Sequence, residues 1–419
     1  MLRLIRKVHV IDPRAPHHHQ TVDLLLDDGV IALVGQDLDI EAAEVLEVEG
    51  LHAMPGGLDV GAWVGDPGFE QREDFDSLSK AAAAGGFTEV AVWPNTLPVV
   101  DGKAEVAYVA RQGERLPVAF HPIGALTKGC EGTTITEMRD MREAGALAFS
   151  DGLQPVRHAG VLLRAMQYVL PFEGLVINQP FDDSVAPNGQ MHEGRVSTLL
   201  GLKGMPPLAE TLMVQRDIDI LRYTGSRLLL HGISCAESVE LVRRAKNEGL
   251  RVYASVPLMN LLFTEDDLAS FDTRFKVVPP LRTAADRAAL IEGLRDGTID
   301  LVTSNHLPEE AEHKEREFAF AAFGASTIQH VWHGLRQAGF SLEEIAELMA
   351  HRPRQVLGLP TPVIDTGAPA NLTLFTPGTR WTFGESHNRS RSTNDPFLDR
   401  PKEGMIRGIA RNGFFVWID

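Results

Sequence analysis

Between about residues 54 and 355, short apolar runs alternate with helical segments, and this alternation constrains the fold more than any other feature of the sequence. The segment VELVRRAKNEGLRVYASV shows the repeating unit, which is an amphipathic helix, a glycine stop and a continuous apolar strand. Seven or eight buried strands separated by helices predict an α/β fold, a (β/α)8 TIM-type barrel, with a doubly wound sheet as the rival. Ser341 and Glu344 in SLEEIAELM predict a capping-box start to a late helix.

The two ends of the chain carry a different pattern of short β-type runs. The first 53 residues contain VDLLLDDGVIALVG and AEVLEVEGLHAMPG, and the pattern returns in VIDTGAPANLTLFTP and GIARNGFFVW. Two β-rich ends around one barrel predict that they pair into one small domain. We expect a β-sandwich domain of residues 1–53 and 356–419 and a barrel domain of residues 54–355. The polar stretch SHNRSRSTNDPFLDRPKEG predicts an ordered loop or a partner surface.

Composition excludes several classes of function. A formal net charge of -17 and a pI near 5.3 argue against binding to nucleic acid or to an anionic membrane, because both need clustered Lys and Arg. Only Cys130 and Cys235 occur, so a disulfide framework is not expected and the reducing cytosol is the natural compartment. No apolar run has membrane-spanning length. These features predict a cytoplasmic protein whose partners are small molecules or other proteins.

Several long stretches carry a resemblance to a known family. They are MPGGLDV, DPGFEQREDFDSLSKAAAAGGFTEVAVWPNTLPVVD, MHEGRVSTLLGLKGMPPLAE, FKVVPPLRTAADRAALIEGLRDGTIDLVTSNHLP and IDTGAPANLTLF. With them the chain resembles a dihydroorotase of the amidohydrolase superfamily over nearly its whole length. The resemblance implies a zinc-dependent ring hydrolase that interconverts carbamoyl aspartate and dihydroorotate in pyrimidine synthesis. In such a site the metal lowers the pKa of bound water from about 15.7 to about 7 and polarises the ring carbonyl.

The first strand of the predicted barrel lacks the side chains that the resemblance implies. The family places two histidine ligands and a substrate-binding arginine here, and the matching positions hold Gly61, Trp63 and Gly65 in GLDVGAWVGDPGF. Glycine has no side chain, and the tryptophan indole nitrogen can only donate a hydrogen bond. This strand is therefore expected to hold no metal and no substrate clamp.

The remaining implied positions are mixed. Asp151 in ALAFSDG and His231 in LLLHGIS match metal-ligand positions of the family, whereas Gln179 stands where a histidine is expected. Asn305 stands at the position of the aspartate that serves as general base. An amide cannot exchange protons near neutral pH, and loss of a general base alone costs about 10² to 10⁴ in rate.

Substrate contacts are also incomplete. Asn95 in WPNT matches a substrate-binding position, and it is the one candidate for substrate binding. The family's second substrate asparagine is Val278 here, and its arginine is Gly65. Recognition of a dianionic substrate would therefore lack its main bidentate clamp.

Only Asp151 and His231 are good ligands among these positions, and a catalytic zinc needs about three protein ligands and water. We therefore interpret the chain as a degenerate, dihydroorotase-like pseudoenzyme with no predicted cofactor. The resemblance implies a role as a structural partner of aspartate carbamoyltransferase in a homo- or hetero-oligomer. Two alternatives stay open. One is an active dihydroorotase or related cyclic-amide hydrolase with a single metal on Asp151, His231 and Gln179, and the other is a module that senses a pyrimidine intermediate through Asn95.

Other polar residues receive structural interpretations. His330 and His333 lie three residues apart on a predicted helix, and His306 lies in a loop; all three are expected to be structural. The run of three histidines at residues 17–19 is expected to be an exposed, functionally silent turn. Cys235 is expected to be a small buried side chain rather than a nucleophile. The segment from Met191 to Pro207 is expected at the top of the barrel, as a retained surface or as packing.

Overall fold

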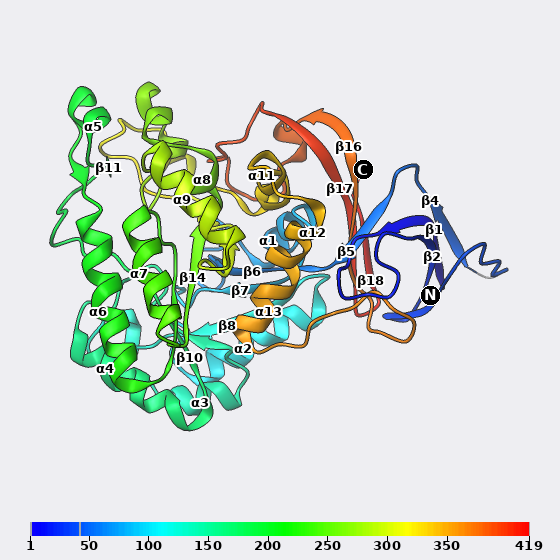
Figure 1. Cartoon of the computed structure of the whole chain (residues 1–419), viewed down its shortest axis with the longest axis horizontal. Coiled ribbons are helices and arrows are strands. Elements are labelled where there is room, and N and C mark those ends of the chain that lie inside the picture. Colours follow the sequence, from blue (N-terminus) through cyan, green and yellow to red (C-terminus); the bar gives the residue numbers. More distant parts are fainter. Residues whose placement is uncertain (1, 42, 419) are drawn as a thin grey trace.

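The computed structural model describes residues 2–41 and 43–418. The larger part of the chain forms a barrel of eight parallel strands surrounded by helices (Figure 1). The strands follow one another around the barrel in chain order: β6 (Gly57–Ala62), β7 (Phe87–Val92), β8 (Ala119–Gly124), β9 (Ala148–Phe149), β10 (Leu175–Asn178), β13 (Arg227–Leu230), β14 (Val252–Pro257) and β15 (Leu301–Thr303). The first and last strands approach each other, since the Thr303 hydroxyl donates to the Val60 carbonyl at 2.7 Å. The predicted barrel is confirmed, and the doubly wound sheet is excluded because the strand order never reverses.

Helices cover the outside of the barrel. The longer ones are α1 (Phe75–Ala84), α2 (Lys103–Arg115), α4 (Ala159–Val169), α6 (Leu208–Thr224), α7 (Ala236–Asn247) and α9 (Ala284–Arg295). Shorter ones are α3 (Met138–Glu143), α5 (Arg195–Leu200), α8 (Leu258–Leu262), α10 (Ala311–Lys314), α11 (Val331–Gln337), α12 (Leu342–Ala346) and α13 (Arg352–Leu357). None of the described helices combines the length and the apolar character that a membrane span requires.

The predicted helix-to-strand unit is present in α7 and β14. Val239, Val242 and Ala245 are buried at three-residue spacing on one face of α7. Gly249 follows the helix with a φ of 80°, in the left-handed region that favours glycine. The predicted capping box of α12 is also present: the Glu344 backbone N–H donates to the Ser341 hydroxyl, and the Glu344 carboxylate accepts from the Ser341 N–H.

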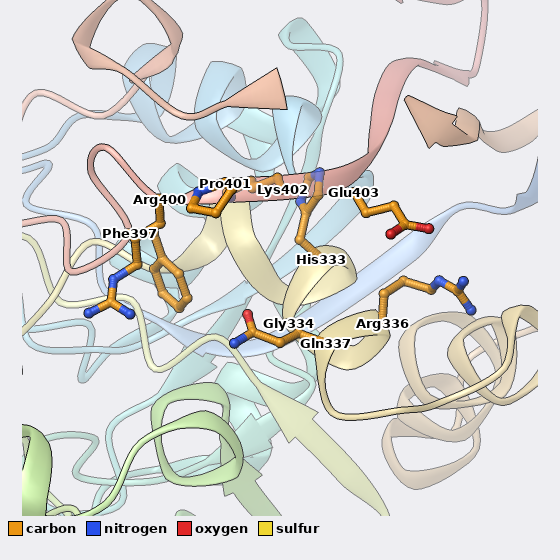
Figure 2. Close-up of a pocket in the computed structure, with 9 residues that line it drawn as sticks. All are labelled: His333, Gly334, Arg336, Gln337, Phe397, Arg400, Pro401, Lys402 and Glu403. Carbon is orange, nitrogen blue, oxygen red and sulfur yellow. The ribbon is translucent and has the colours of Figure 1, made fainter. Parts of the chain in front are cut away.

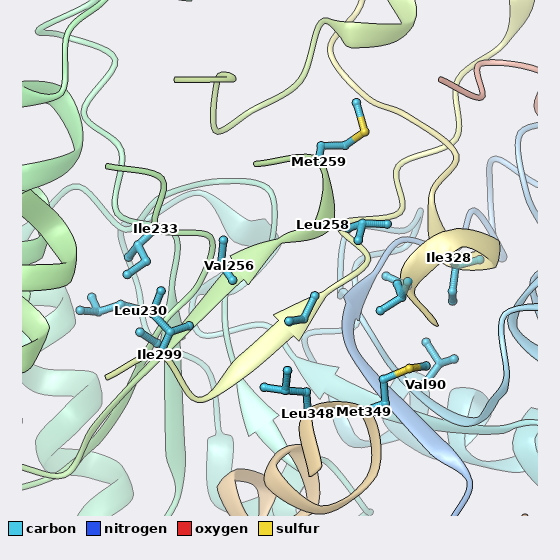
Figure 3. Packing of buried hydrophobic residues seen from close by; sticks show 14 of the residues in the cluster. Val90, Leu230, Ile233, Val256, Leu258, Met259, Ile299, Ile328, Leu348 and Met349 are labelled. Carbon is cyan, nitrogen blue, oxygen red and sulfur yellow. The ribbon is translucent and has the colours of Figure 1, made fainter. Parts of the chain in front are cut away.

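Apolar side chains fill the space between the strands and the surrounding helices. Figure 3 shows part of this cluster, in which Leu230 and Val256 from neighbouring strands pack near Ile299 and Leu348. Each of these four side chains is at most 2% exposed. Burial of apolar surface on this scale supplies the main stabilisation of the fold, at about 25 cal/mol per Å².

Strands from both termini form a second, mixed sheet beside the barrel (Figure 1). Its strands are β1 (Arg3–Val10), β2 (Thr21–Asp27), β3 (Val30–Gly35), β4 (Glu44–Glu47), β5 (His52–Pro55), β16 (Asn371–Thr382), β17 (Pro401–Arg411) and β18 (Phe414–Trp417). The two ends of the chain meet where β5 pairs antiparallel with β16, with Met54 opposite Thr373. The pairing of the termini is confirmed, and the small domain takes the form of one continuous hydrogen-bonded sheet of eight strands.

Candidate functional site

The carboxyl ends of the barrel strands bring the positions singled out in the sequence to one end of the barrel, which we call the barrel mouth. Gly61 lies in β6, and Trp63 follows that strand directly. The other positions also follow their strands: Asp151 after β9, Gln179 after β10, His231 after β13 and Asn305 after β15. This is the edge at which barrel enzymes carry their chemistry.

Tryptophan occupies the space beside Gly61. A β-carbon built on Gly61 would lie 2.4 Å from Cζ2 of Trp93 and 2.7 Å from Cε1 of His231, closer than real Cβ contacts. The φ of Gly61 is 93°, which L side chains rarely adopt. Trp93 is 2% exposed and meets the His231 ring edge to face, with centroids 4.7 Å apart. Position 61 therefore has no room for a metal-binding side chain.

The Trp63 side chain is fixed by its neighbours in the same way. Its indole N–H donates to the carbonyl of Asn95 at 2.9 Å, and its ring is 2% exposed. The guanidinium of Arg72 lies 4.2 Å from the centre of this ring and is held by the Pro308 carbonyl and the Glu309 carboxylate. Trp63 is therefore a buried, stacked residue and not a group that swings freely in an open cavity.

Position 65 is closed as well. A β-carbon on Gly65 would lie 2.2 Å from the carbonyl oxygen of Phe69 and 2.8 Å from Cη2 of Trp63. The backbone of Phe69 approaches this closely because its N–H donates to the Gly65 carbonyl at 2.6 Å. An arginine could not be placed at position 65 without moving this turn.

Asp151 is buried and its carboxylate is engaged within the protein. One oxygen accepts from the Thr127 N–H at 2.7 Å and the other from the Thr127 hydroxyl at 2.5 Å. Burial raises the pKa of Asp151 to about 6, although the bonds from Thr127 oppose that rise. The side chain is 1% exposed and acts here as a hydrogen-bonded anchor for the loop that begins at Thr127.

His231 has one engaged and one free ring nitrogen. Its Nδ1 lies 3.1 Å from the Ser255 hydroxyl, and Nε2 has no hydrogen-bond partner among the described residues. Burial lowers the pKa of His231 to about 3, so the ring is neutral at neutral pH. A neutral imidazole with a free nitrogen can bind a metal, but the ring of Trp93 lies against this one.

Two of the substituted positions contact each other. The amide of Asn305 donates to the Val278 carbonyl at 3.0 Å, so the residue at the general-base position is bound to the residue at a substrate position. Asn305 adopts a φ of 50°, which asparagine tolerates better than most residues. Gln179 is partly buried after β10. Its amide oxygen is a weak neutral ligand compared with an imidazole.

The amide of Asn95 holds the loop that follows β9. Its nitrogen donates to the Asp151 carbonyl and its oxygen accepts from the Leu153 N–H, both at 3.0 Å. Substrate binding by Asn95 stays a prediction, and these contacts favour a structural role. His306 is likewise engaged at both ring nitrogens, with the Thr327 N–H at 3.1 Å and the Glu73 carboxylate at 3.3 Å.

The donor set at the mouth does not fit a catalytic zinc. Glycine and tryptophan offer no ligand atom, the Asp151 carboxylate is bound to Thr127, and the one free imidazole nitrogen lies beside an indole. Among the described residues, one group of three His, Cys, Asp or Glu side chains is close enough to hold a metal ion, and it does not lie at the mouth. It consists of His18, His19 and Glu343.

Comparison with known proteins identifies the family. A family model described as "Dihydro-orotase-like" matches residues 50–238. The chain is 40% identical to a protein named "Dihydroorotase" from Pelotomaculum thermopropionicum, over 100% of this chain and 99% of that protein. It is 36% identical to a "Dihydroorotase" from Syntrophotalea carbinolica, over 96% of this chain and 95% of that one. The chain belongs to the dihydroorotase family.

Solved structures support the fold of this dihydroorotase-family chain. An "L-Hydantoinase (Dihydropyrimidinase) from Arthrobacter aurescens" superimposes with a TM-score of 0.86 at 24% identity, over 100% of this chain and 96% of that one. A structure titled "Crystal structure of D-hydantoinase" superimposes with a TM-score of 0.84 at 19% identity, over the same shares of the two chains. At these identities the likeness concerns the barrel and the terminal sheet alone.

The loop from Met191 to Pro207 is firmly anchored above the barrel. It contains a short pair of strands, β11 (Met191–His192) and β12 (Gly204–Met205). The buried Arg282 guanidinium contacts Nδ1 of His192 at 3.1 Å, donates to the Met205 carbonyl at 2.8 Å and pairs with the Glu210 carboxylate at 3.3 Å. These contacts hold the loop in place, and its use as a surface stays a prediction.

A cavity of about 400 Å³ lies away from the mouth, between α11 and the start of β17 (Figure 2). His333, one of its lining residues, donates from Nε2 to the Gly404 carbonyl at 3.1 Å, and its partner in the predicted helix, His330, contacts Asp395 at 2.6 Å. Both histidines are buried and serve structural contacts, as expected.

Cys235 is also fully buried, and burial raises the pKa of its thiol well above the usual range, which suits a small core side chain.

The sequence analysis singled out Trp63 but neither Trp93, which packs beside Gly61 at the mouth, nor a buried hydrogen-bonded chain of side chains behind this cavity. Trp93 follows β7 directly, so inspection of every strand end would have found it. The second group consists of Lys402, His330 and Asp395. The ammonium of Lys402 can only donate, so Nδ1 of His330 accepts from it and the other nitrogen donates to Asp395. No local sequence signal joins residues that lie so far apart in the chain.

Proposed function

We propose that this dihydroorotase-family protein does not hydrolyse or close the dihydroorotate ring, and that its barrel is a degenerate, zinc-free copy of the family's catalytic domain. The observation that carries the proposal is the packing at Gly61. The family resemblance places a histidine ligand there, and a β-carbon at this position would lie 2.4 Å from Trp93. A histidine at position 61 could not be accommodated by a change of its rotamer, because the Trp93 ring fills the space that its β-carbon would take.

The remaining groups support the same proposal. Asn305 cannot act as a general base near neutral pH, and its amide is bound to the Val278 carbonyl. The Asp151 carboxylate and the Asn95 amide are both engaged in loop contacts. The chemistry of ring closure needs a Lewis acid, a base and an anion clamp, and each of these three groups is substituted or occupied.

For the role that replaces catalysis, we propose that the chain is a structural partner of aspartate carbamoyltransferase in pyrimidine biosynthesis. The family resemblance supports this partner. The helix α6 carries exposed apolar side chains that suit a contact: Leu208, Leu212 and Tyr223 are each 48% to 76% exposed, and Leu212 and Tyr223 line one shared hollow. Exposed apolar side chains that lie together are typical of a contact surface.

A second candidate is an active dihydroorotase with a reduced metal site, and the comparisons favour it. The relatives that match almost the whole chain at 36% and 40% identity are named as dihydroorotases. On this reading Asp151, His231 and Gln179 would hold a single metal. Such a site would need Trp93 to move away from His231, because the two rings now touch.

Cyclisation of carbamoyl aspartate by purified, tag-free protein in zinc-containing buffer decides between the two candidates. We expect a rate equal to the buffer background, unchanged in the variant His231→Ala. A measurable rate that disappears in His231→Ala would establish the enzyme and overturn the pseudoenzyme proposal. The remaining alternative is a protein that senses dihydroorotate without converting it. It requires that calorimetry shows heat of dihydroorotate binding to the wild type and none to Asn95→Ala.

Size-exclusion chromatography with purified aspartate carbamoyltransferase from the same organism tests the partner role. We expect the two proteins to elute together at a defined stoichiometry. The double variant Leu212→Glu, Tyr223→Glu should separate them, since it places two charges in the proposed contact surface. Separate elution of the wild-type proteins at micromolar concentration would contradict this role without affecting the proposal about catalysis.

A further inference from the structure

A group of metal-binding side chains lies where the terminal sheet meets the barrel. His18 and His19 belong to the turn between β1 and β2, and Glu343 lies in the first turn of α12. One potential ligand atom from each of the three residues lies within 4.8 Å of the others. The sequence interpretation treated this histidine run as silent, because nothing in the local sequence shows that a barrel glutamate faces it.

We propose that His18, His19 and Glu343 form a binding site for a zinc-class divalent cation that joins the terminal sheet to the barrel. Two imidazoles and one carboxylate are ligands that Zn²⁺ takes in proteins, with water as the fourth. Imidazole ligands favour late first-row metals over Mg²⁺ and Ca²⁺, which prefer sites made of oxygen ligands alone.

The atomic positions suit this cation. Nε2 of His19 lies 3.5 Å from the Glu343 carboxylate, and the rings of His18 and His19 have centroids 3.8 Å apart. Ligand atoms around a tetrahedral zinc are separated by about 3.3 Å, given metal–ligand bonds of about 2.0 Å. Nδ1 of His18 is buried and has no hydrogen-bond partner within the described chain, so it is available as a ligand.

The turn that carries the two histidines is held in place by its backbone. The His18 N–H donates to the Ala15 carbonyl at 3.3 Å, and the His19 N–H donates to the Val10 carbonyl at 2.9 Å. His19 has a φ of 61°, in the left-handed region that a histidine enters at a cost of about 1 kcal/mol. The backbone therefore presents the two rings together, on the side of the turn that faces Glu343.

Further contacts fix the barrel side of this junction. Residues four apart along α12 and the helical turn that continues it (Glu347–His351) face residues that run backwards along the β1–β2 connection: Glu343 faces His19, Glu347 lies 3.4 Å from Arg14, and His351 lies 3.4 Å from Asp12. The turn thus follows the helix in antiparallel register. A cation at the first of these three contacts would be held between two elements that are already aligned.

Zinc titration of the full-length protein, prepared without a histidine tag and stripped with chelator, tests the proposal. Isothermal calorimetry should show one zinc per chain, and zinc should raise the thermal midpoint of unfolding. The variants His18→Ala and Glu343→Gln should each weaken binding by at least about tenfold and remove the thermal shift. The matched control is His17→Ala, in the same turn but beside Asp365 and outside the group, and it should bind zinc as the wild type does.

The outcomes are distinguishable from those of the catalytic question. The wild-type chain binding no zinc, or binding it equally well in His18→Ala and Glu343→Gln, would overturn the junction site. Zinc lost instead in His231→Ala would place the metal at the mouth, which overturns both this inference and the pseudoenzyme proposal. Zinc lost only in the turn and helix variants leaves the barrel mouth metal-free and supports both.

Discussion

The barrel mouth and the junction between the barrel and the terminal sheet differ in their side chains: the mouth is packed with aromatic rings, whereas the junction is lined by polar and charged groups. At the mouth, where the family resemblance places metal ligands, Trp63 and Trp93 fill the space, and each is 2% exposed. At the junction, charged and imidazole groups from distant segments face one another, including His19 with Glu343 and Lys402 with His330. The comparison teaches that one barrel can carry tightly packed aromatic side chains at one end and clustered polar groups at another, because the fold depends on neither.

The sharpest test of the packed mouth is the variant Trp93→Ala. Removal of a buried tryptophan should lower the free energy of unfolding by about 3 to 5 kcal/mol, through lost burial and the cavity left behind. Urea denaturation measures this loss. The control is Trp417→Ala, since Trp417 on β18 is only partly buried and should cost under about 2 kcal/mol. Equal losses in the two variants, together with new ring-closing activity, would mean that Trp93 is a lid over a working site.

At the junction, Lys402 predicts a pH dependence of stability. Burial lowers the pKa of Lys402 to about 7, so between pH 7 and 10.5 the unfolded chain binds a proton that the folded chain does not. The contribution of Lys402 to the free energy of unfolding should therefore rise with pH in that window, by about 3 kcal/mol between pH 7.5 and 10 at about 1.4 kcal/mol per pKa unit.

The variant Lys402→Met should lose this rise, and urea denaturation at a series of pH values measures it. Lys80→Met is the control, because Lys80 is exposed and should leave the wild-type slope in place. Burial also lowers the pKa values of Lys276 and Lys314 to about 8, so part of the slope should remain in Lys402→Met. An unchanged slope in Lys402→Met would show that Lys402 is protonated throughout and that its contacts with His330 and three aromatic rings outweigh the burial.

A smaller effect is expected from Gly61→Ala, which adds only one carbon at the mouth. Overpacking against Trp93 and the positive φ should together cost about 2 to 4 kcal/mol. Gly132→Ala is matched in φ, at 71°, but has open space around its β-carbon, so it should cost only about 1 kcal/mol. The difference between the two midpoints of denaturation isolates the contact with Trp93. No difference would mean that the mouth can expand to admit a side chain.

The least effect is expected from Arg14→Met at the junction. Arg14 and Glu347 lie 3.4 Å apart, and about a third of each side chain is exposed. An ion pair of this kind contributes less than about 1 kcal/mol, so the thermal midpoint should change little at any salt concentration. A large loss of stability would show that the turn relies on this pair, and that zinc is not needed to hold it against α12.

Much of this protein followed from its sequence because the relevant patterns are local. The alternation of apolar strands and helices predicted the barrel, and the β-type runs at the two ends predicted that the termini pair. The family resemblance carried by GLDVGAWVG implied that Gly61, Trp63 and Gly65 stand at ligand and substrate positions, and this assignment stays a prediction.

Tertiary structure decided what occupies those positions. The sequence alone could not show that Trp93 lies 2.4 Å from where a Gly61 side chain would begin, because the two belong to different strands. Nor could it show that the histidine turn faces Glu343, or that Lys402 reaches His330, since these residues lie far apart in the chain. Periodicity and motif spacing describe neighbours along the backbone. Contacts between side chains from distant elements depend on how the elements pack, and packing is fixed only when the whole fold is formed.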